Sequence, residues 1–185
     1  MIPITWPFAV WGLDLVGPLQ KAPGGFTHLL VAIDKFSKWI EVRPITRIKA
    51  EHAVLFFTDI IHLFGVPNSI ITNNGTQFTG QKFLDFCDRH HIWVDWAAVA
   101  HPKTNGSVER ASGMILQGLK PRIFNRLDKF GKRWLKELPV VIWSLRTSRS
   151  RATGFTLFFM VYGSEAVLPT DLECHRTDQI IRVQV

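Results

Sequence analysis

The beginning of the chain alternates apolar runs with turn residues, a pattern that predicts three β-strands. The first apolar run covers Phe8–Val16, and the second, almost wholly apolar, covers His28–Ile33. A third strand is expected from Trp39 to Val42, ending at Pro44. Because an all-apolar strand is typical of one buried on both faces, the second strand should lie inside the sheet. The short links between the three runs favour antiparallel hairpins.

From about residue 49 the apolar positions recur at helical spacing instead. One helix is expected over 49–64, where Gly65-Val66-Pro67 ends it. The remaining pattern predicts short strands at 69–72 and 92–96, and helices over 80–91, from Ser107 onward and over 132–146. The last helix should point Trp134, Leu138 and Val141 inward. Pro121 and Pro139 should kink or interrupt their helices, because proline cannot donate the backbone hydrogen bond there.

The predicted order is therefore three strands, then helix, strand, helix, strand and two helices. It favours an α/β fold with a five-stranded mixed sheet, three antiparallel strands followed by two parallel ones, and helices on both faces. We expect one domain over residues 5–173 and leave the tail, 174–185, unassigned.

The composition favours a polyanionic partner. The net charge is +7 and the sequence pI about 9.8, which suits nucleic acid, although a merely basic globular domain would share these values. The two cysteines form no Cys-x-x-Cys pair, and the histidines show no zinc-ligand pattern. No apolar run is long enough for a membrane span.

Three polar positions are candidates for chemistry: Asp14, Asn73 and Glu109. Each has an ordinary explanation: a solvent-facing acid at a strand end, a turn residue before Asn74-Gly75, and an acid in the first turn of a helix. Together they belong to strand one, strand four and the helix after strand five, which can converge on one edge of such a sheet. These ordinary explanations do not predict that convergence.

With an acid at position 73, these three residues would make a divalent-metal site for phosphodiester chemistry. Two such ions activate the nucleophile and stabilise the leaving oxygen, and Mg²⁺ prefers carboxylate oxygens. Asn73 keeps one ligating oxygen but lacks the negative charge. The other acids are poor replacements: Asp34 should lie at the opposite end of its strand pair from Asp14, and Asp85 and Asp88 lie in a helix away from the strand end.

Several stretches resemble the motif blocks of retroelement integrase catalytic cores, especially those of gypsy-type long-terminal-repeat retrotransposons of plants. The three main blocks are Trp11–Leu19, Ile71–Phe78 and His101–Arg110. Ile33–Trp39 and Val161–Pro169 extend the similarity, and 109 − 73 − 1 = 35 residues separate Asn73 from Glu109.

The resemblance implies an RNase H-like fold and a two-metal site of Asp14, Asn73 and Glu109 that binds Mg²⁺ or Mn²⁺. It also implies the activity of a polynucleotidyl transferase, which trims the ends of element DNA and joins them to target DNA. DNA as partner, a homo-oligomer and a nuclear location follow from the same resemblance.

The chain departs from the family pattern at the second metal position, where Asn73 replaces Asp. Loss of that charge is expected to lower ion affinity and rate. Pro121, and Leu157 where the family usually has Pro, are further departures. A catalytically inactive DNA-binding or oligomerising remnant is therefore an open alternative. An RNase H-type nuclease is a weaker one, because the block around Glu109 matches integrases better.

DNA contacts are expected from residues near the third block: His101, Lys103, Asn105, Arg110 and Gln117. For the first three, an ordinary solvated loop is an equally good explanation. The seven tryptophans are interpreted mostly as core residues and not as platforms for base stacking.

Overall fold

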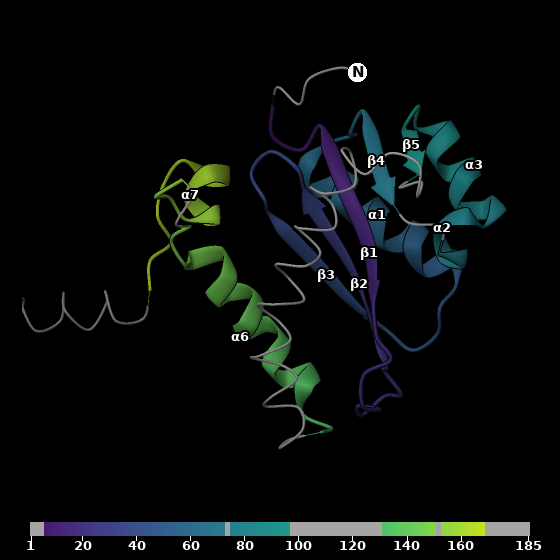
Figure 1. The fold of residues 1–185 in the computed structure, drawn as a ribbon, viewed down its shortest axis with the longest axis horizontal. Helices are drawn as coiled ribbons and strands as arrows, with labels where there is room; N and C mark the ends of the chain where they lie inside the picture. The colour runs from purple at the N-terminus through teal and green to yellow at the C-terminus, as the bar shows by residue number, and fades with distance from the viewer. Residues whose placement is uncertain (1–5, 73–74, 97–130, 151–152, 169–185) are drawn as a thin grey trace, which may run out of the picture.

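The fold comes from a computed structural model that describes residues 6–72, 75–96, 131–150 and 153–168 (Figure 1). Its elements follow in chain order: β1 Val10–Val16, β2 His28–Asp34, β3 Ile40–Ile45, α1 Ala50–Phe64, β4 Ser69–Thr72, α2 Thr76–Thr79, α3 Gln81–Arg89, β5 Trp93–Trp96, α6 Trp134–Thr147 and α7 Leu157–Tyr162. The helix expected from Ser107, which contains Pro121, lies outside the described residues.

The five strands form one mixed sheet in the order β3-β2-β1-β4-β5. The first three strands pair antiparallel, and β4 and β5 continue the sheet in parallel to β1, which confirms the predicted topology. The third strand runs further than expected, through Pro44 to Ile45. Proline is tolerated there because β3 is an edge strand, where an N–H can be missing without breaking the sheet.

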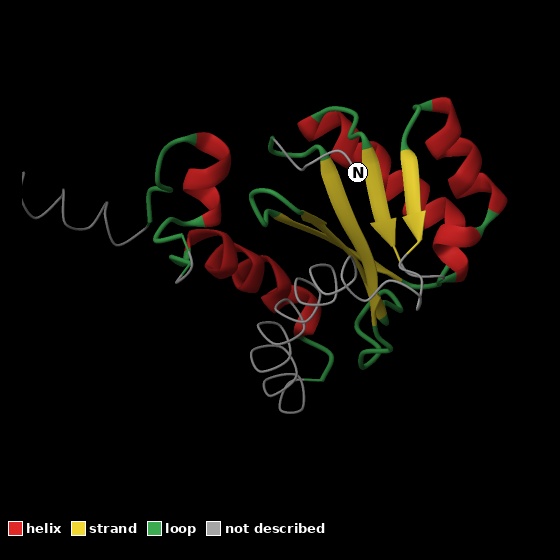
Figure 2. Ribbon diagram, turned by 45° about the horizontal axis from the view of Figure 1, so that its top comes forward, coloured by secondary structure: helices red, strands yellow, loops and turns green. Residues whose placement is uncertain are grey.

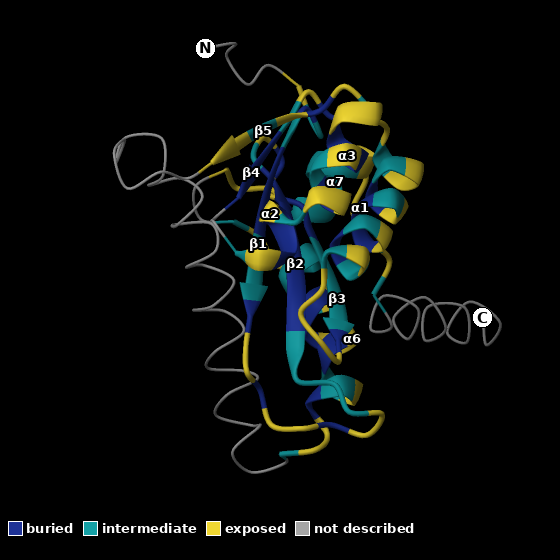
Figure 3. Ribbon diagram, turned by 90° about the vertical axis from the view of Figure 1, so that its right-hand side faces the viewer, coloured by how far each residue is buried: buried dark blue, intermediate teal, exposed yellow. Residues whose placement is uncertain are grey.

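Helices cover both faces of this sheet (Figure 2), and β2 shows why. Its alternate residues belong to two separate apolar clusters. Leu30 and Ala32 pack in the cluster of α1 and α3, whereas Leu29, Val31 and Ile33 pack in the cluster of α6. Because successive side chains of a strand point to opposite faces, an all-apolar strand needs a cover on each side. Figure 3 shows the resulting buried course of β2 through the middle of the molecule.

The helix expected over 80–91 is α3, and a short helix that the sequence did not predict, α2, precedes it and ends at Gly80. Gly80 has extended backbone angles, φ −65° and ψ 138°. A Cβ at this position would lie 3.0 Å from the Cβ of Ala50 at the start of α1. The break between the two helices therefore lets the chain pass close to α1, an approach that helical periodicity in the sequence does not reveal.

The short helix α7 was not expected from the sequence. It begins after Thr156, whose hydroxyl accepts a hydrogen bond from the Phe159 N–H at 2.9 Å and donates one to Glu165 at 2.6 Å. It ends at Gly163, which has φ 71°. Capping at both ends explains a helix that is too short to show a clear apolar period.

The prediction that the tryptophans are mostly core is wrong. Trp11, Trp39 and Trp134 are buried, but the other four are exposed: Trp6 by 47%, Trp93 by 78%, Trp96 by 38% and Trp143 by 42%. Within the described ranges, no helix combines the length and the hydrophobicity needed to cross a bilayer.

Candidate functional site

The parallel pairing of β1 with β4 creates the rim at which the candidate site lies. Val10 pairs with Ser69, and the register continues until Leu13 pairs with Thr72. Both strands run in the same direction, so their carboxyl ends meet at one edge of the sheet (Figure 1). Asp14 is the next residue of β1 after this last pair.

Asp14 is half-buried and lies on the sheet face opposite α1. Its antiparallel partner is Val31, a member of the α6-side cluster, whereas the preceding Leu13 packs in the α1 cluster. One carboxylate oxygen accepts the Leu15 N–H at 2.7 Å. Removing a carboxylate partly from water is costly unless polar or cationic partners compensate. Asp14 is therefore not an acid that simply faces solvent, since the backbone holds its partly buried carboxylate.

The Asp34 carboxylate lies away from the end of β1 at Asp14, as expected, and binds other groups. Asp34 pairs level with Trp11, three residues before Asp14, and is completely buried. Its carboxylate accepts hydrogen bonds from the Phe8 N–H at 2.9 Å, the Ser37 N–H at 2.7 Å and the Ser37 hydroxyl at 2.6 Å. These three hydrogen bonds join the segment before β1 to the turn after β2, so Asp34 is not a substitute for a missing acid at the rim.

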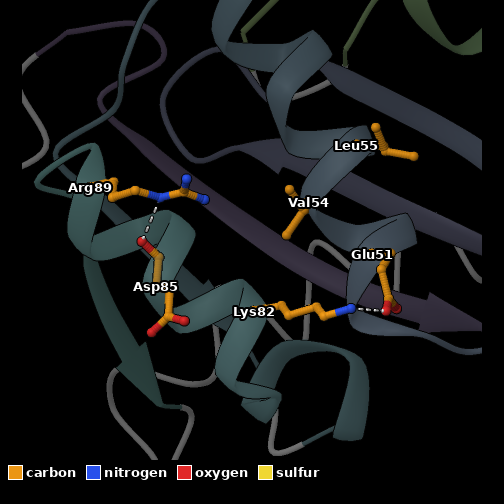
Figure 4. A pocket seen from close by; sticks show the side chains of 6 residues that line it. All are labelled: Glu51, Val54, Leu55, Lys82, Asp85 and Arg89. Carbon is orange, nitrogen blue, oxygen red and sulfur yellow. Dashed lines mark hydrogen bonds and ion pairs between the residues drawn. The ribbon is translucent and has the colours of Figure 1, made fainter.

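A second group of charges lines an open groove of about 590 Å³ between α1 and α3 (Figure 4). Lys82 forms an ion pair with Glu51 at 2.6 Å, and this hydrogen bond lowers the pKa of the Glu51 carboxyl. Asp85 accepts a hydrogen bond from the Gln81 side chain at 2.7 Å, and its carbonyl accepts one from Arg89 at 3.2 Å. These opposite charges largely neutralise one another.

Among the described residues, no group of three or more His, Cys, Asp and Glu side chains is arranged to hold a metal ion. Cys87 does not offer a nucleophile either. Burial, with a smaller contribution from Asp88, raises the pKa of its thiol to about 12, so the reactive thiolate is scarce at neutral pH.

Of the candidate metal ligands and DNA contacts, the structure describes Asp14. The others lie outside the described residues: Asn73, His101, Lys103, Asn105, Glu109, Arg110 and Gln117. The register of β1 and β4 pairs Thr72, the last described residue before Asn73, with Leu13, the residue before Asp14.

The turn after β4 leads through Gly75, whose φ is −62° and ψ 139°, angles that any residue adopts. Gln77 lies directly against this glycine and is only 3% exposed. Gln77 was not among the candidate residues of the sequence. The one feature that could have indicated it is its position between the Asn-Asn-Gly turn and the apolar Phe78.

Comparison with known proteins identifies the family. The family described as Integrase core domain matches residues 5–102, which are 98 of the 185 residues. The Pro-Pol polyprotein of simian foamy virus type 3 (strain LK3) is 27% identical over 163 residues, and the Transposon Tf2-3 polyprotein of Schizosaccharomyces pombe is 27% identical over 173 residues. These matches cover 88% and 92% of this chain but only 14% and 13% of the polyproteins.

The fold agrees with this assignment. The structure of the HTLV-2 integrase catalytic core domain in complex with magnesium, in a trimeric form, superposes with a TM-score of 0.62 at 26% identity. The match covers 82% of this chain and 95% of that one. The mixed sheet with helices on both faces is thus the RNase H-like fold of integrase cores, and the chain belongs to the integrase core domain family.

Proposed function

We propose that this chain is the catalytic core of a gypsy-type retrotransposon integrase, with its site at the rim where β1 and β4 end. The register of Leu13 with Thr72 is the observation that carries the proposal. Asp14 and Asn73 each follow one member of that pair in the chain, and consecutive Cα atoms are about 3.8 Å apart. Glu109 completes the proposed site from the helix expected after β5.

The surroundings of Asp14 suit a ligand of a divalent ion. It is a half-buried carboxylate, one oxygen of which accepts a backbone N–H, and hard oxygen ligands of this kind suit Mg²⁺ or Mn²⁺. Asn73 would contribute its amide oxygen, and Glu109 its carboxylate. Bound ions would supply the positive charge that activates an attacking hydroxyl and stabilises the leaving oxygen during DNA end trimming and strand transfer.

The net charge of +7 supports DNA as the partner. We propose His101, Lys103, Asn105, Arg110 and Gln117 as DNA contacts and residues 5–173 as the core domain, with 174–185 as an unassigned tail. Assembly as a homo-oligomer and work in the nucleus, on element ends and target DNA, belong to the same proposal.

Asn73 favours a second candidate, a DNA-binding or oligomerising remnant that no longer catalyses. An amide keeps the shape of the aspartate but carries no charge. In a partly desolvated site the interaction of that charge with a divalent ion is much stronger than in water. We therefore propose that catalysis by this copy is impaired, although DNA binding is retained.

The test compares the chain with Asn73→Asp in strand-transfer and disintegration assays with Mg²⁺ and with Mn²⁺. The substitution should tighten Mn²⁺ binding, measured by titration calorimetry, by about tenfold or more, and should raise activity in both metals. The double variant Asp14→Asn/Asn73→Asp is the matched control, because it restores one charge and removes another, and it should lose the gain.

Equal and robust activity of the unmodified chain and of the Asn73→Asp variant would refute the account of the missing charge. Retained DNA binding without metal binding or activity in every variant would favour the remnant. Cleavage of an RNA–DNA hybrid in preference to joining of DNA ends would favour the nuclease.

A further inference from the structure

The turn that leads from β4 into α2 is packed around one buried polar side chain, Gln77. Its carboxamide is enclosed although the residue lies only two positions beyond Gly75, at the surface end of the strand. Burying an amide is unfavourable unless its polar atoms find hydrogen-bond partners. The enclosure therefore indicates a specific place for this side chain.

Gly75 provides that place. A Cβ on Gly75 would lie 2.9 Å from both Cδ and Oε1 of Gln77, and closer still to Nε2. Real Cβ contacts are essentially never that short, so the amide occupies the space that a side chain at position 75 would need. Because the backbone angles of Gly75 are ordinary, the glycine matters here for the room it leaves to the Gln77 amide and not for its own conformation.

The helix α2 holds Gln77 firmly in this position. The residue after Gln77, Phe78, is 1% exposed and packs edge-on against Phe83, with 5.7 Å between the ring centroids. The Gly75 carbonyl accepts the N–H groups of Phe78 at 2.8 Å and Thr79 at 3.0 Å. The glycine is thus clamped between the start of α2 and the Gln77 amide.

The other end of the turn is held by the sheet. Thr72 is fully buried and pairs with both Leu13 of β1 and Trp96 of β5. Only two residues separate Thr72 from Gly75, and three virtual bonds of about 3.8 Å span this stretch. Gly75 therefore stays within a short reach of the end of β4.

We infer that Gln77 is a positioning residue, whose buried amide holds Gly75 and thereby sets where position 73 stands relative to Asp14. The inference deepens the proposed function and rests on it for the role of position 73. Gln77 itself touches neither metal nor DNA in this account; it acts through the turn.

The experiment compares the unsubstituted chain with its Gln77→Leu variant. Mass spectrometry measures the rate of amide hydrogen exchange in the peptide that spans residues 72–76. Loss of the amide should speed exchange there on the order of tenfold, because the turn opens locally without global unfolding. Gly75→Ala fills the space of the amide and should speed exchange in the same peptide. This variant replaces Gln77→Leu in the experiment if Gln77→Leu does not fold. Gln81→Leu is the matched control, because the side chain of this exposed helical glutamine donates to Asp85 within the same helix and its loss should leave the turn unchanged.

A second readout connects the turn to the site. In the Asn73→Asp background, Gln77→Leu should weaken Mn²⁺ binding by about 10- to 100-fold, the usual effect of losing a residue that orients a metal ligand. The inference is overturned if the exchange rate at 72–76 does not change, or if exchange in β2 speeds up equally. It is also overturned if the Mn²⁺ affinity in the Asn73→Asp background does not change. If Asn73→Asp with Gln77 intact binds no metal, the proposed function fails, while the exchange result still decides whether Gln77 holds the turn.

Discussion

At the scale of single residues, Asp34 shows what a buried charge does in this fold. Its carboxylate joins the segment before β1, through the Phe8 N–H, to the turn between β2 and β3, through Ser37. Phe8 has φ 66°, a conformation that costs energy for a residue with a bulky side chain. The hydrogen bond to Asp34 therefore helps to hold a conformation that the chain would not adopt alone.

Replacing this carboxylate should destabilise the protein strongly. We expect Asp34→Ala to lower the free energy of unfolding by about 3 kcal/mol, because it leaves buried N–H donors without an acceptor. Urea denaturation followed by circular dichroism measures the change.

Asp59→Ala is the matched control, because its carboxylate pairs with Arg43 at the exposed surface. This change should cost about 0.5 kcal/mol or less. Similar losses for the two aspartates would show that the network around Asp34 contributes no more than a surface ion pair.

At the scale of elements, α6 forms across a residue that normally interrupts a helix. Pro139 lies six residues into α6 and is exposed. The residues that seat the helix, Trp134, Leu138, Val141 and Ile142, are all buried against the sheet. Packing of this face compensates for the missing backbone hydrogen bond, which is why the apolar period predicted α6 correctly despite the proline.

Pro139→Ala should therefore stabilise the protein. Alanine restores the backbone N–H and is about 3 kcal/mol more favourable than proline within a helix, and the greater freedom of the unfolded chain offsets about 1 kcal/mol of this gain. We expect a net increase in the free energy of unfolding of about 1–2 kcal/mol, measured by thermal and urea denaturation.

Lys136→Ala, at an exposed position of the same helix, should change the stability by about 0.5 kcal/mol or less. A destabilising effect of Pro139→Ala would mean instead that the proline is needed to seat Trp134 and Leu138.

At the scale of the whole molecule, α6 is fastened near its start to the loop after β1 and near its end to β3. Near its start, the buried Trp134 donates a hydrogen bond to the Gln20 carbonyl at 2.7 Å. Near its end, Arg146 donates to the Ile40 carbonyl and to Glu41, each at 2.7 Å, and its guanidinium lies 4.2 Å from the centre of the Trp39 ring. More than 100 residues of chain separate the partners in both places.

Trp134→Phe should weaken this long-range connection. It removes the hydrogen bond to Gln20 and leaves part of the indole volume empty, at a cost of about 2 kcal/mol. Trp143→Phe is the control, since Trp143 is 42% exposed and should matter far less. Equal effects of the two substitutions on the urea midpoint would contradict the proposed importance of the Trp134 anchor.

Much of this architecture was predictable because its causes are local. The all-apolar run of β2 indicated a central strand, and the helical period over α1 predicted that helix to within one residue at its start. The predictions failed where a distant segment decides the outcome. Gly80 divides α2 from α3 because Ala50 lies against it, and the exposure of Trp93 depends on its place in the edge strand β5.

The sequence alone determined that position 73 carries an uncharged amide, since no fold can add the missing charge to Asn73. It also determined the order of the five strands and of the longer helices α1, α3 and α6, because the apolar period is a property of neighbouring residues. Only the tertiary structure decided that Leu13 stands level with Thr72 and that the Gln77 amide fills the space beside Gly75. Register and side-chain contact arise when distant segments pack together, and a linear pattern of residues carries no distances between them.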